Sequence, residues 1–219
     1  MRYASLAICF VNIRLNSTAK VRIFFHSAKY YFSMSRKLCI FVVRNMDYIT
    51  HYNSPLGGIT LASDGKALSG LWFDGQKYFG STMGAQTFSS AYQGRTLEYA
   101  PTELPFFDVA RRWLDIYFSG RKPDFMPPVA FRGTAFQQRV WEALLTIPYG
   151  QTVTYGELAR RLGCRSAQAV GGAVGRNPIS IIVPCHRVVG ASGALTGYAA
   201  GLDRKRTLLD LEQKNYFAN

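Results

Sequence analysis

A cysteine and a histidine stand side by side near the C-terminal end of the chain, and together they could carry out nucleophilic chemistry. An unperturbed thiol has a pKa of about 8.5, so Cys185 would need a nearby base to form a reactive thiolate. His186 is the nearest candidate, and Glu212 is a candidate for the third group that orients such an imidazole. The alternative is that Cys185 only packs in the core, as most buried cysteines do.

The residues before this pair, 179–183, are apolar and mostly β-branched, which predicts a buried strand. Neighbouring residues of an extended strand point to opposite faces. Direct contact between Cys185 and His186 would therefore require a bend in the chain, or a water molecule between the two side chains.

Three helix starts precede this strand. Two are capping boxes, in which a threonine and the side chain three residues later satisfy unpaired backbone N–H groups: Thr134 with Gln137 and Thr154 with Glu157. Ser166 can cap a third helix. The sequence therefore predicts helices over 135–147, 155–162 and 166–175, and a further helix that carries Glu212.

The second and third of these helices are joined by a short turn at Gly163 and Cys164, which is typical of a helix-turn-helix and equally of an ordinary helical hairpin. The third helix holds two interior glycines, which cost about 1 kcal/mol each relative to alanine. Such a bare helix could approach the DNA minor groove, which is only about 6 Å wide, or pack closely against another helix. Nearby arginines could contact phosphates or form a solvated face: Arg160, Arg161, Arg165 and Arg176.

The middle of the chain predicts a small antiparallel sheet and one helix. Short runs of strand-forming residues at 48–52, 59–62 and 68–73 are separated by turn signals. Apolar residues recur at helical spacing over 102–118, with Thr102 as the N-cap and Gly120 at the stop. Prolines follow, so we expect a domain boundary near 121–130 and a mainly supporting role for this segment.

Composition narrows the class of protein. Apolar residues make up 48% of the 219 residues and charged residues 18%, which excludes a disordered chain and a coiled coil. No run of about 18 apolar residues occurs, so a membrane span is not expected. The four cysteines lie far apart and form no C-x-x-C pair, so neither a zinc ribbon nor a disulfide scaffold is indicated: Cys9, Cys39, Cys164 and Cys185.

The net charge of +13 is concentrated at the two ends of the chain. Residues 1–45 hold 8 basic and no acidic residues, 46–125 hold 7 and 8, and 126–219 hold 11 and 5. A clustered basic surface suggests a polyanionic partner such as nucleic acid. Only the excess in 126–219 coincides with the predicted helix-turn-helix.

Residues 1–45 form a basic extension in which no periodicity persists. A secretory signal or an organellar transit peptide is possible on composition, and so is a dispensable extension or an unused upstream start. We hypothesise that the working protein begins near Met46, with an α/β domain over 46–125 and a second domain over 126–219. From Met46 onward, 18 basic and 13 acidic residues leave a net charge of +5.

The segment Pro184-Cys185-His186-Arg187-Val188 resembles the active-site signature of the O6-alkylguanine-DNA alkyltransferases, also called methylated-DNA–protein-cysteine methyltransferases. The resemblance covers about 46–214 and is strongest from 131 onward. Further matching segments follow in the family's order: Phe136-Gln137-Gln138-Arg139-Val140-Trp141, Ile147-Pro148-Tyr149-Gly150, Tyr155-Gly156-Glu157-Leu158-Ala159, Ala169-Val170-Gly171-Gly172-Ala173, Gly197-Tyr198, and Leu208-Leu209 through Glu212.

This resemblance implies an α/β (α+β) fold, with a small ribonuclease H-like antiparallel-sheet domain before a helical, winged helix-turn-helix domain. It implies that the protein binds double-stranded DNA through the minor groove and flips the alkylated guanine into a pocket. It further implies irreversible transfer of the alkyl group from O6-alkylguanine to Cys185 in a single turnover, with O4-alkylthymine as a second candidate substrate. No metal or diffusible cofactor is implied, and we expect a cytoplasmic monomer, associated with the nucleoid in a bacterium.

The resemblance also assigns roles to single residues. Cys185 is the nucleophile, His186 takes its proton through a water, and Glu212 orients His186. Tyr155 donates a proton toward the departing guanine, the region of Tyr198 lines the pocket, and Asn177 holds the active-site turn. The other residues that it places in the pocket or on the DNA-binding surface are Ala167, Gln168, Gly171, Gly172, Arg176 and Arg187.

Gln168 departs from the family's pattern, because many members place an arginine there to fill the gap left by the flipped base. Glutamine is shorter and uncharged, although its amide can still hydrogen-bond the orphaned base. Two other classes of protein stay open beside the alkyltransferase: a DNA-lesion-binding module in which Cys185 is merely buried, and a hydrolase that uses Cys185, His186 and Glu212.

Overall fold

The computed structural model describes residues 48–83 and 105–216, together with four short strands within 11–39. The chain divides into two units, residues 1–44 and 45–219. In the first unit β1 (Val11–Leu15) pairs with β2 (Ala19–Ile23), and β3 (Met34–Ser35) pairs with β4 (Leu38–Cys39), both antiparallel. The sequence predicted no element there. The hypothesised start at Met46 lies outside the described residues.

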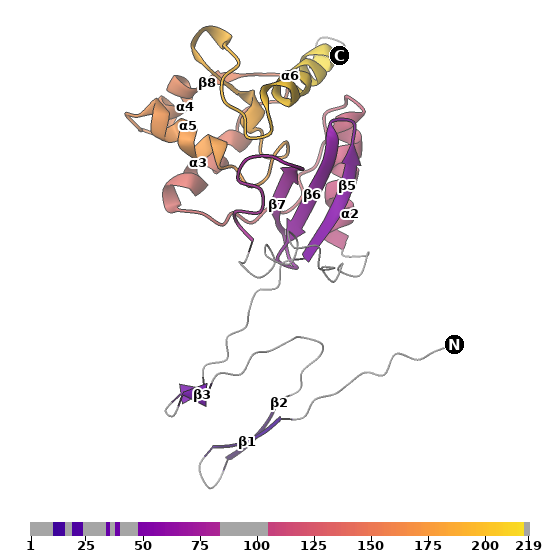
Figure 1. Ribbon diagram of the computed structural model, residues 1–219, viewed down its shortest axis with the longest axis vertical. Coiled ribbons are helices and arrows are strands. Elements are labelled where there is room, and N and C mark those ends of the chain that lie inside the picture. The colour runs from indigo at the N-terminus through magenta and orange to yellow at the C-terminus, as the bar shows by residue number, and fades with distance from the viewer. Residues whose placement is uncertain are drawn as a thin grey trace, which may run out of the picture. The chain divides into compact units, whose positions relative to one another are not determined.

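The predicted antiparallel sheet is confirmed. β5 (Tyr48–Ser54), β6 (Gly57–Ser63) and β7 (Leu68–Phe73) form a three-stranded meander in the order β5-β6-β7, as Figure 1 shows. The turns use glycines in the left-handed region, where a side chain would be strained: Gly57 has φ 107° and Gly65 has φ 92°. Every residue of β7 is buried, so this strand lies inside the molecule.

The predicted helix of the middle segment is α2 (Pro105–Phe118), which contacts β5 and β7. Its N-cap was expected at Thr102, which lies outside the described residues. Gly120 follows the helix with φ 84°, the conformation that ends helices and that glycine adopts most easily. The buried face of α2 presents apolar and aromatic side chains: Phe107, Ala110, Trp113, Leu114 and Tyr117.

The second half of the described chain is mainly helical, as the sequence predicted. The helices are α3 (Ala135–Leu145), α4 (Tyr155–Arg161), α5 (Ala167–Gly175) and α6 (Leu202–Tyr216). Both predicted capping boxes are present, and Ser166 caps α5. A short parallel pair, β8 (Val153–Thr154) with β9 (Val188–Val189), ties the start of α4 to the chain just after Cys185. Two 3-10 turns complete the segment, η1 (Cys185–Arg187) and η2 (Ala191–Gly193).

The predicted strand over residues 179–183 is wrong. Only Ile179 makes a bridge, to Leu71, and the chain then folds back on itself. Ile181 has φ 67°, which no strand residue adopts, and Val183 N donates to Ile179 O at 3.1 Å. The run is apolar because it is buried on all sides. Burial alone does not distinguish a strand from a tight turn.

The two halves of this unit share one hydrophobic core, built from β6, β7 and α2 together with α3, α5 and residues 179–188. The edge of β7 is hydrogen-bonded to the second half: Leu71 N donates to Pro178 O at 2.8 Å, and Ser180 N donates to Leu71 O at 2.9 Å. The sheet therefore holds the turn that leads to Cys185. The division into domains 46–125 and 126–219 stays a prediction.

The capping box of α4 yields a test of local stability. Thr154 Oγ1 accepts from Glu157 N at 3.1 Å, and Thr154 N donates to Glu157 Oε2 at 2.7 Å. Thr154→Ala should lower the free energy of unfolding by about 1 kcal/mol, measured by denaturant titration. The exposed Thr152 is the control, since Thr152→Ala removes no cap. An equal loss in both variants would contradict the capping role.

Candidate active site

Cys185 lies at the start of η1 and is buried, with only 5% of its surface exposed. The 3-10 turn supplies the bend that an extended strand would lack. Asn177 fixes the turn: its Nδ2 donates to Cys185 Sγ at 3.1 Å and to Val183 O at 2.8 Å, while its Oδ1 accepts from Ile179 N at 3.1 Å. The same side chain therefore shapes the turn and contacts the sulfur, which supports the expected role of Asn177.

His186 is completely buried, and its Nε2 lies 2.7 Å from Glu212 Oε1. A carboxylate only accepts hydrogen bonds, so Nε2 carries the proton and the imidazole is held by that contact. Nδ1 is buried too, and it has no hydrogen-bond partner among the described residues. The second nitrogen of the ring is therefore the one that can accept a proton.

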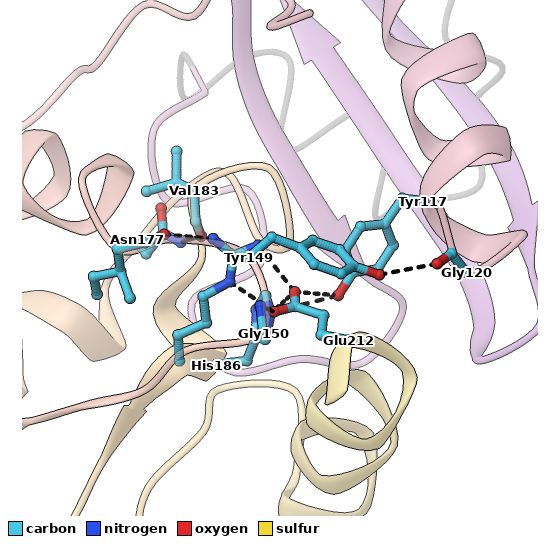
Figure 2. Close-up of polar contacts among 10 residues, drawn as sticks. Tyr117, Gly120, Tyr149, Gly150, Asn177, Val183, His186 and Glu212 are labelled. Atoms are coloured by element: carbon cyan, nitrogen blue, oxygen red, sulfur yellow. Dashed lines mark hydrogen bonds and ion pairs between the residues drawn. The ribbon is translucent and has the colours of Figure 1, made fainter. Parts of the chain in front are cut away.

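Glu212, on α6, accepts hydrogen bonds at both oxygens (Figure 2). Oε1 accepts from His186, from Arg187 Nη2 at 3.0 Å and from Tyr117 OH at 2.8 Å. Oε2 accepts from Arg187 Nε at 2.8 Å and from Gly150 N at 3.0 Å. A buried carboxylate needs this degree of compensation, because an unpaired buried charge is costly.

The environment keeps the thiol and the imidazole neutral at rest. Burial raises the pKa of Cys185, against the hydrogen bond from Asn177 and the charge of Lys205. Burial lowers the pKa of His186, although Glu212 acts in the opposite direction. Burial alone would raise the pKa of Glu212, but His186 and Arg187 outweigh it and hold that pKa below its ordinary value. The carboxylate thus stays charged and orients the imidazole.

Two tyrosines expected at the site lie near Cys185. Tyr155 begins α4, and its hydroxyl donates to Gly197 O at 3.3 Å and Thr196 O at 3.4 Å. Burial, and next the charge of a Cys185 thiolate, raise the pKa of Tyr155. The same two causes raise the pKa of Tyr198, whose hydroxyl is buried. Both phenols are therefore protonated and able to donate.

α5 presents small side chains to solvent. Ala167, Gln168 and Gly172 are exposed and Gly171 is half-buried, whereas Val170, Ala173 and Val174 face the core. A Cβ on Gly171 would lie 3.6 Å from the Tyr155 ring, so α5 also passes close to the candidate site. Arg160, Arg161, Arg165 and Arg176 are all exposed.

Two arginines expected in the pocket or on the DNA-binding surface lie in different environments. Arg176 is exposed, donates to Gly172 O at 3.2 Å and stacks over the Tyr78 ring at 5.1 Å. Arg187 is buried, and besides Glu212 it contacts Ile147 O. Arg187 therefore supports the Glu212 carboxylate, and its expected place in the pocket or on the DNA-binding surface stays a prediction.

Sequence reasoning missed three residues that the structure brings to the site. Tyr117 and Gly150 contact Glu212, and Lys205 Nζ donates to Val188 O at 2.6 Å and Thr196 O at 2.8 Å. Burial lowers the pKa of Lys205 to about 8, against the charge of Cys185. Helical spacing placed Tyr117 on a buried face, but no sequence signal indicated a polar partner so far along the chain.

In the described part of the chain, no group of three or more His, Cys, Asp or Glu side chains could hold a metal ion. Each helix there is too short or too polar to cross a lipid bilayer.

Two family models match the chain. Residues 48–131 match the 6-O-methylguanine DNA methyltransferase, ribonuclease-like domain, and residues 135–214 match the DNA binding domain of the same family. The methylated-DNA–protein-cysteine methyltransferase of Mycobacterium bovis is 46% identical over 167 residues, which is 74% of this chain and 92% of that protein. The protein of that name from Haemophilus influenzae is 41% identical over 171 residues, covering 77% and 88%.

The chain is also similar to solved structures of proteins from this family. The O6-methylguanine methyltransferase of Mycobacterium tuberculosis is 46% identical with a TM-score of 0.65, covering 78% of this chain and 94% of that one. The OGT of Mycobacterium tuberculosis in complex with DNA is 45% identical with a TM-score of 0.63, covering 77% and 94%.

The Glu212 carboxylate predicts a pH-dependent stability. Glu212→Gln leaves Arg187 buried without its counter-charge, so the free energy of unfolding at pH 7 should fall by about 3–5 kcal/mol. Because the folded pKa of Glu212 lies below its ordinary value of 4.5, its contribution is fully present above that pH. It is lost as the pH falls from 4.5 toward the folded pKa.

Denaturant titrations of both proteins between pH 7 and pH 3 measure this difference. The gap between wild type and Glu212→Gln should stay constant down to about pH 5 and narrow below pH 4.5. A gap that is unchanged at pH 3 would show that the charge of Glu212 does not carry the stabilisation.

Proposed function

The chain belongs to the 6-O-methylguanine DNA methyltransferase family, and on that premise we propose that Cys185 is the residue that receives the alkyl group. The protein reverses DNA damage directly, by moving the alkyl group from O6-alkylguanine to itself. One observation carries the assignment of the site: the thiol of Cys185, the imidazole of His186 and the anchored carboxylate of Glu212 lie together in one buried cluster, and His186 Nδ1 has no hydrogen-bond partner among the described residues.

Proton transfer is the first step. His186 Nδ1 takes the thiol proton through a bridging water, and the imidazolium is stabilised by Glu212, which keeps its negative charge. Asn177 Nδ2 donates to the sulfur and so favours the thiolate, as does the positive charge of Lys205. This pair of contacts offsets part of the cost of forming a buried anion.

Alkyl transfer is the second step. The thiolate attacks the alkyl carbon on O6, a C–S bond forms, the C–O bond breaks, and its electron pair stays with the guanine. Tyr155 donates a proton toward the guanine ring as it leaves, and Tyr198 lines the pocket. The product at Cys185 is a thioether, which has no thiol left to deprotonate, so each molecule reacts once.

DNA reaches this site through α5. Its exposed face carries only small side chains and Gln168, so the helix can enter a shallow or widened minor groove. The exposed arginines around α4 and α5 supply phosphate contacts, which provide most of the binding free energy. Flipping the base costs a few kcal/mol and is least costly for a damaged pair, so alkylated guanine is selected. We expect a monomer to suffice.

Transfer of a radiolabelled methyl group tests the assignment. DNA carrying O6-[³H]methylguanine should label the wild-type protein with close to one methyl group per molecule. The label should lie on the peptide that contains Cys185. Cys185→Ala should abolish labelling and still bind the same DNA, because the phosphate contacts lie on α4 and α5. Tight binding by wild type with an intact lesion would instead identify a lesion-binding module, and turnover of esters without labelling would identify a hydrolase.

Gln168 yields a second test, because it is exposed in the first turn of α5. Gln168→Ala should slow repair of alkylated duplex DNA by about 2- to 10-fold, the value of one hydrogen bond to the orphaned base. Reaction with free O6-benzylguanine, measured side by side, should be unchanged. Gln213→Ala, at an exposed position of α6, is the matched control. Equal slowing of both substrates by Gln168→Ala would refute the role.

A further inference from the structure

A tyrosine of the first half of the unit contacts the relay of the second half. Tyr117, near the end of α2, is completely buried, and its hydroxyl donates to Glu212 Oε1 at 2.8 Å (Figure 2). The same hydroxyl lies 3.4 Å from His186 Nε2, and the two rings meet edge to face at 6.5 Å. The reaction steps above make no use of this side chain.

The hydroxyl shares one acceptor atom with the imidazole. Because His186 Nε2 and Tyr117 OH both carry hydrogens that point to Oε1, neither can donate to the other, and both hold the same oxygen in place. The position of Oε1 in turn fixes the His186 ring. Among the described residues, the ring makes polar contacts only with this oxygen and, at the longer distance of 3.4 Å, with the Tyr117 hydroxyl. Displacing Oε1 would therefore rotate Nδ1 relative to Cys185.

We propose that Tyr117 is a positioning residue of the transfer reaction, whose hydroxyl holds Glu212 Oε1 and limits how strongly that oxygen attracts the proton of His186. This inference rests on the proposed role of Cys185 and His186. It assigns a part in the chemistry to a helix that contains no residue of the relay itself.

The direction of the effect follows from the charges around the imidazole. Burial is the main cause that lowers the pKa of His186; Glu212 acts to raise it, and the cations Arg187 and Lys205 add to the lowering. Tyr117 is a permanent donor, because burial and then the charge of Glu212 raise its pKa well above the ordinary value. When the Tyr117 hydroxyl is removed, Oε1 accepts one hydrogen bond fewer and its negative charge is less compensated. Glu212 should then raise the pKa of His186 further.

The other titratable groups that face the cluster are phenols, the thiol and Lys205, whose pKa burial lowers to about 8. Tyr149 packs edge to face on Tyr117 at 6.1 Å and lies beneath the Arg187 guanidinium at 5.6 Å. Burial raises the pKa of Tyr149 to about 12, and burial raises the pKa values of Tyr198 and Cys185. The phenols and the thiol stay neutral between pH 5 and pH 8, and Lys205 titrates near the upper end of that interval. A change on the acid side therefore reports on His186.

Tyr117→Phe tests the proposal, because it removes the hydroxyl and keeps the ring. The rate of benzyl transfer from free O6-benzylguanine is measured between pH 5 and pH 9, which avoids any contribution from DNA binding. A protonated imidazole cannot take the thiol proton, so the rate falls on the acid side. In the variant the midpoint of this fall should move up by about 0.5 to 1 pH unit.

Tyr149→Phe is the matched control. Its hydroxyl donates to Gly120 O at 3.3 Å and makes no hydrogen bond to Glu212 within the described residues, although the ring lies in the same cluster. This variant should lose a comparable amount of thermal stability and keep the wild-type midpoint. A Tyr117→Phe profile that is lower at every pH but has an unmoved midpoint would assign Tyr117 a purely structural role and overturn the proposal.

A measurement on wild type covers the case in which the variant fails to fold. With ¹³Cζ-labelled tyrosine, the Tyr117 signal should shift at the pH where His186 titrates, and a signal that does not respond would overturn the proposal. Failure of the proposed function looks different, since wild type would then not transfer benzyl to Cys185 at any pH.

Discussion

The site depends on the buried carboxylate of Glu212. An ion of this kind is tolerated inside a protein only when its lone pairs are satisfied, because desolvation costs several kcal/mol. The five hydrogen bonds that satisfy it come from α2, from the turn after α3 and from η1, while Glu212 itself lies on α6. These elements must all be in place before the charge is compensated. The His186 ring is therefore oriented only when these elements of the unit have folded together.

The same burial decides the protonation states of Cys185 and His186 at rest. Low dielectric disfavours both ions of a thiolate–imidazolium pair, so Cys185 and His186 are neutral at rest. Asn177 and Lys205 lower the cost of the thiolate without abolishing it, and Glu212 does the same for the imidazolium. The neutral thiol and imidazole are therefore the populated state, and the thiolate–imidazolium pair can form from it at a moderate cost in free energy. For a protein that reacts once, this limits loss of the thiol to unrelated electrophiles before a damaged base is bound.

Local signals in the sequence predicted much of this structure, and long-range polar contacts account for what was missed. Capping boxes at Thr134 and Thr154 fixed helix starts, since the interacting groups lie within four residues. Residues 179–183 were misassigned because their turn is imposed by Asn177 and by the edge of β7. The proximity of His186 and Glu212 was proposed from residue type and resemblance. Helical spacing placed Tyr117 on a buried face of α2, and Lys205 lies on α6, but the partners of both depend on how the elements pack, which periodicity does not encode.

The first half of the unit does more than cover the core. β7 uses its edge to hold the chain at Pro178 and Ser180, one residue on either side of the start of the active-site turn. Gln76, which follows β7, accepts from Phe73 N at 2.9 Å and from Ser180 Oγ at 3.2 Å, so the sheet is joined to that turn by a side chain as well. α2 reaches the opposite side of the cluster through Tyr117. Cys185 and His186 are thus held by two elements that contain neither residue. A C-terminal segment without these contacts would leave both the turn and the Glu212 oxygen less constrained.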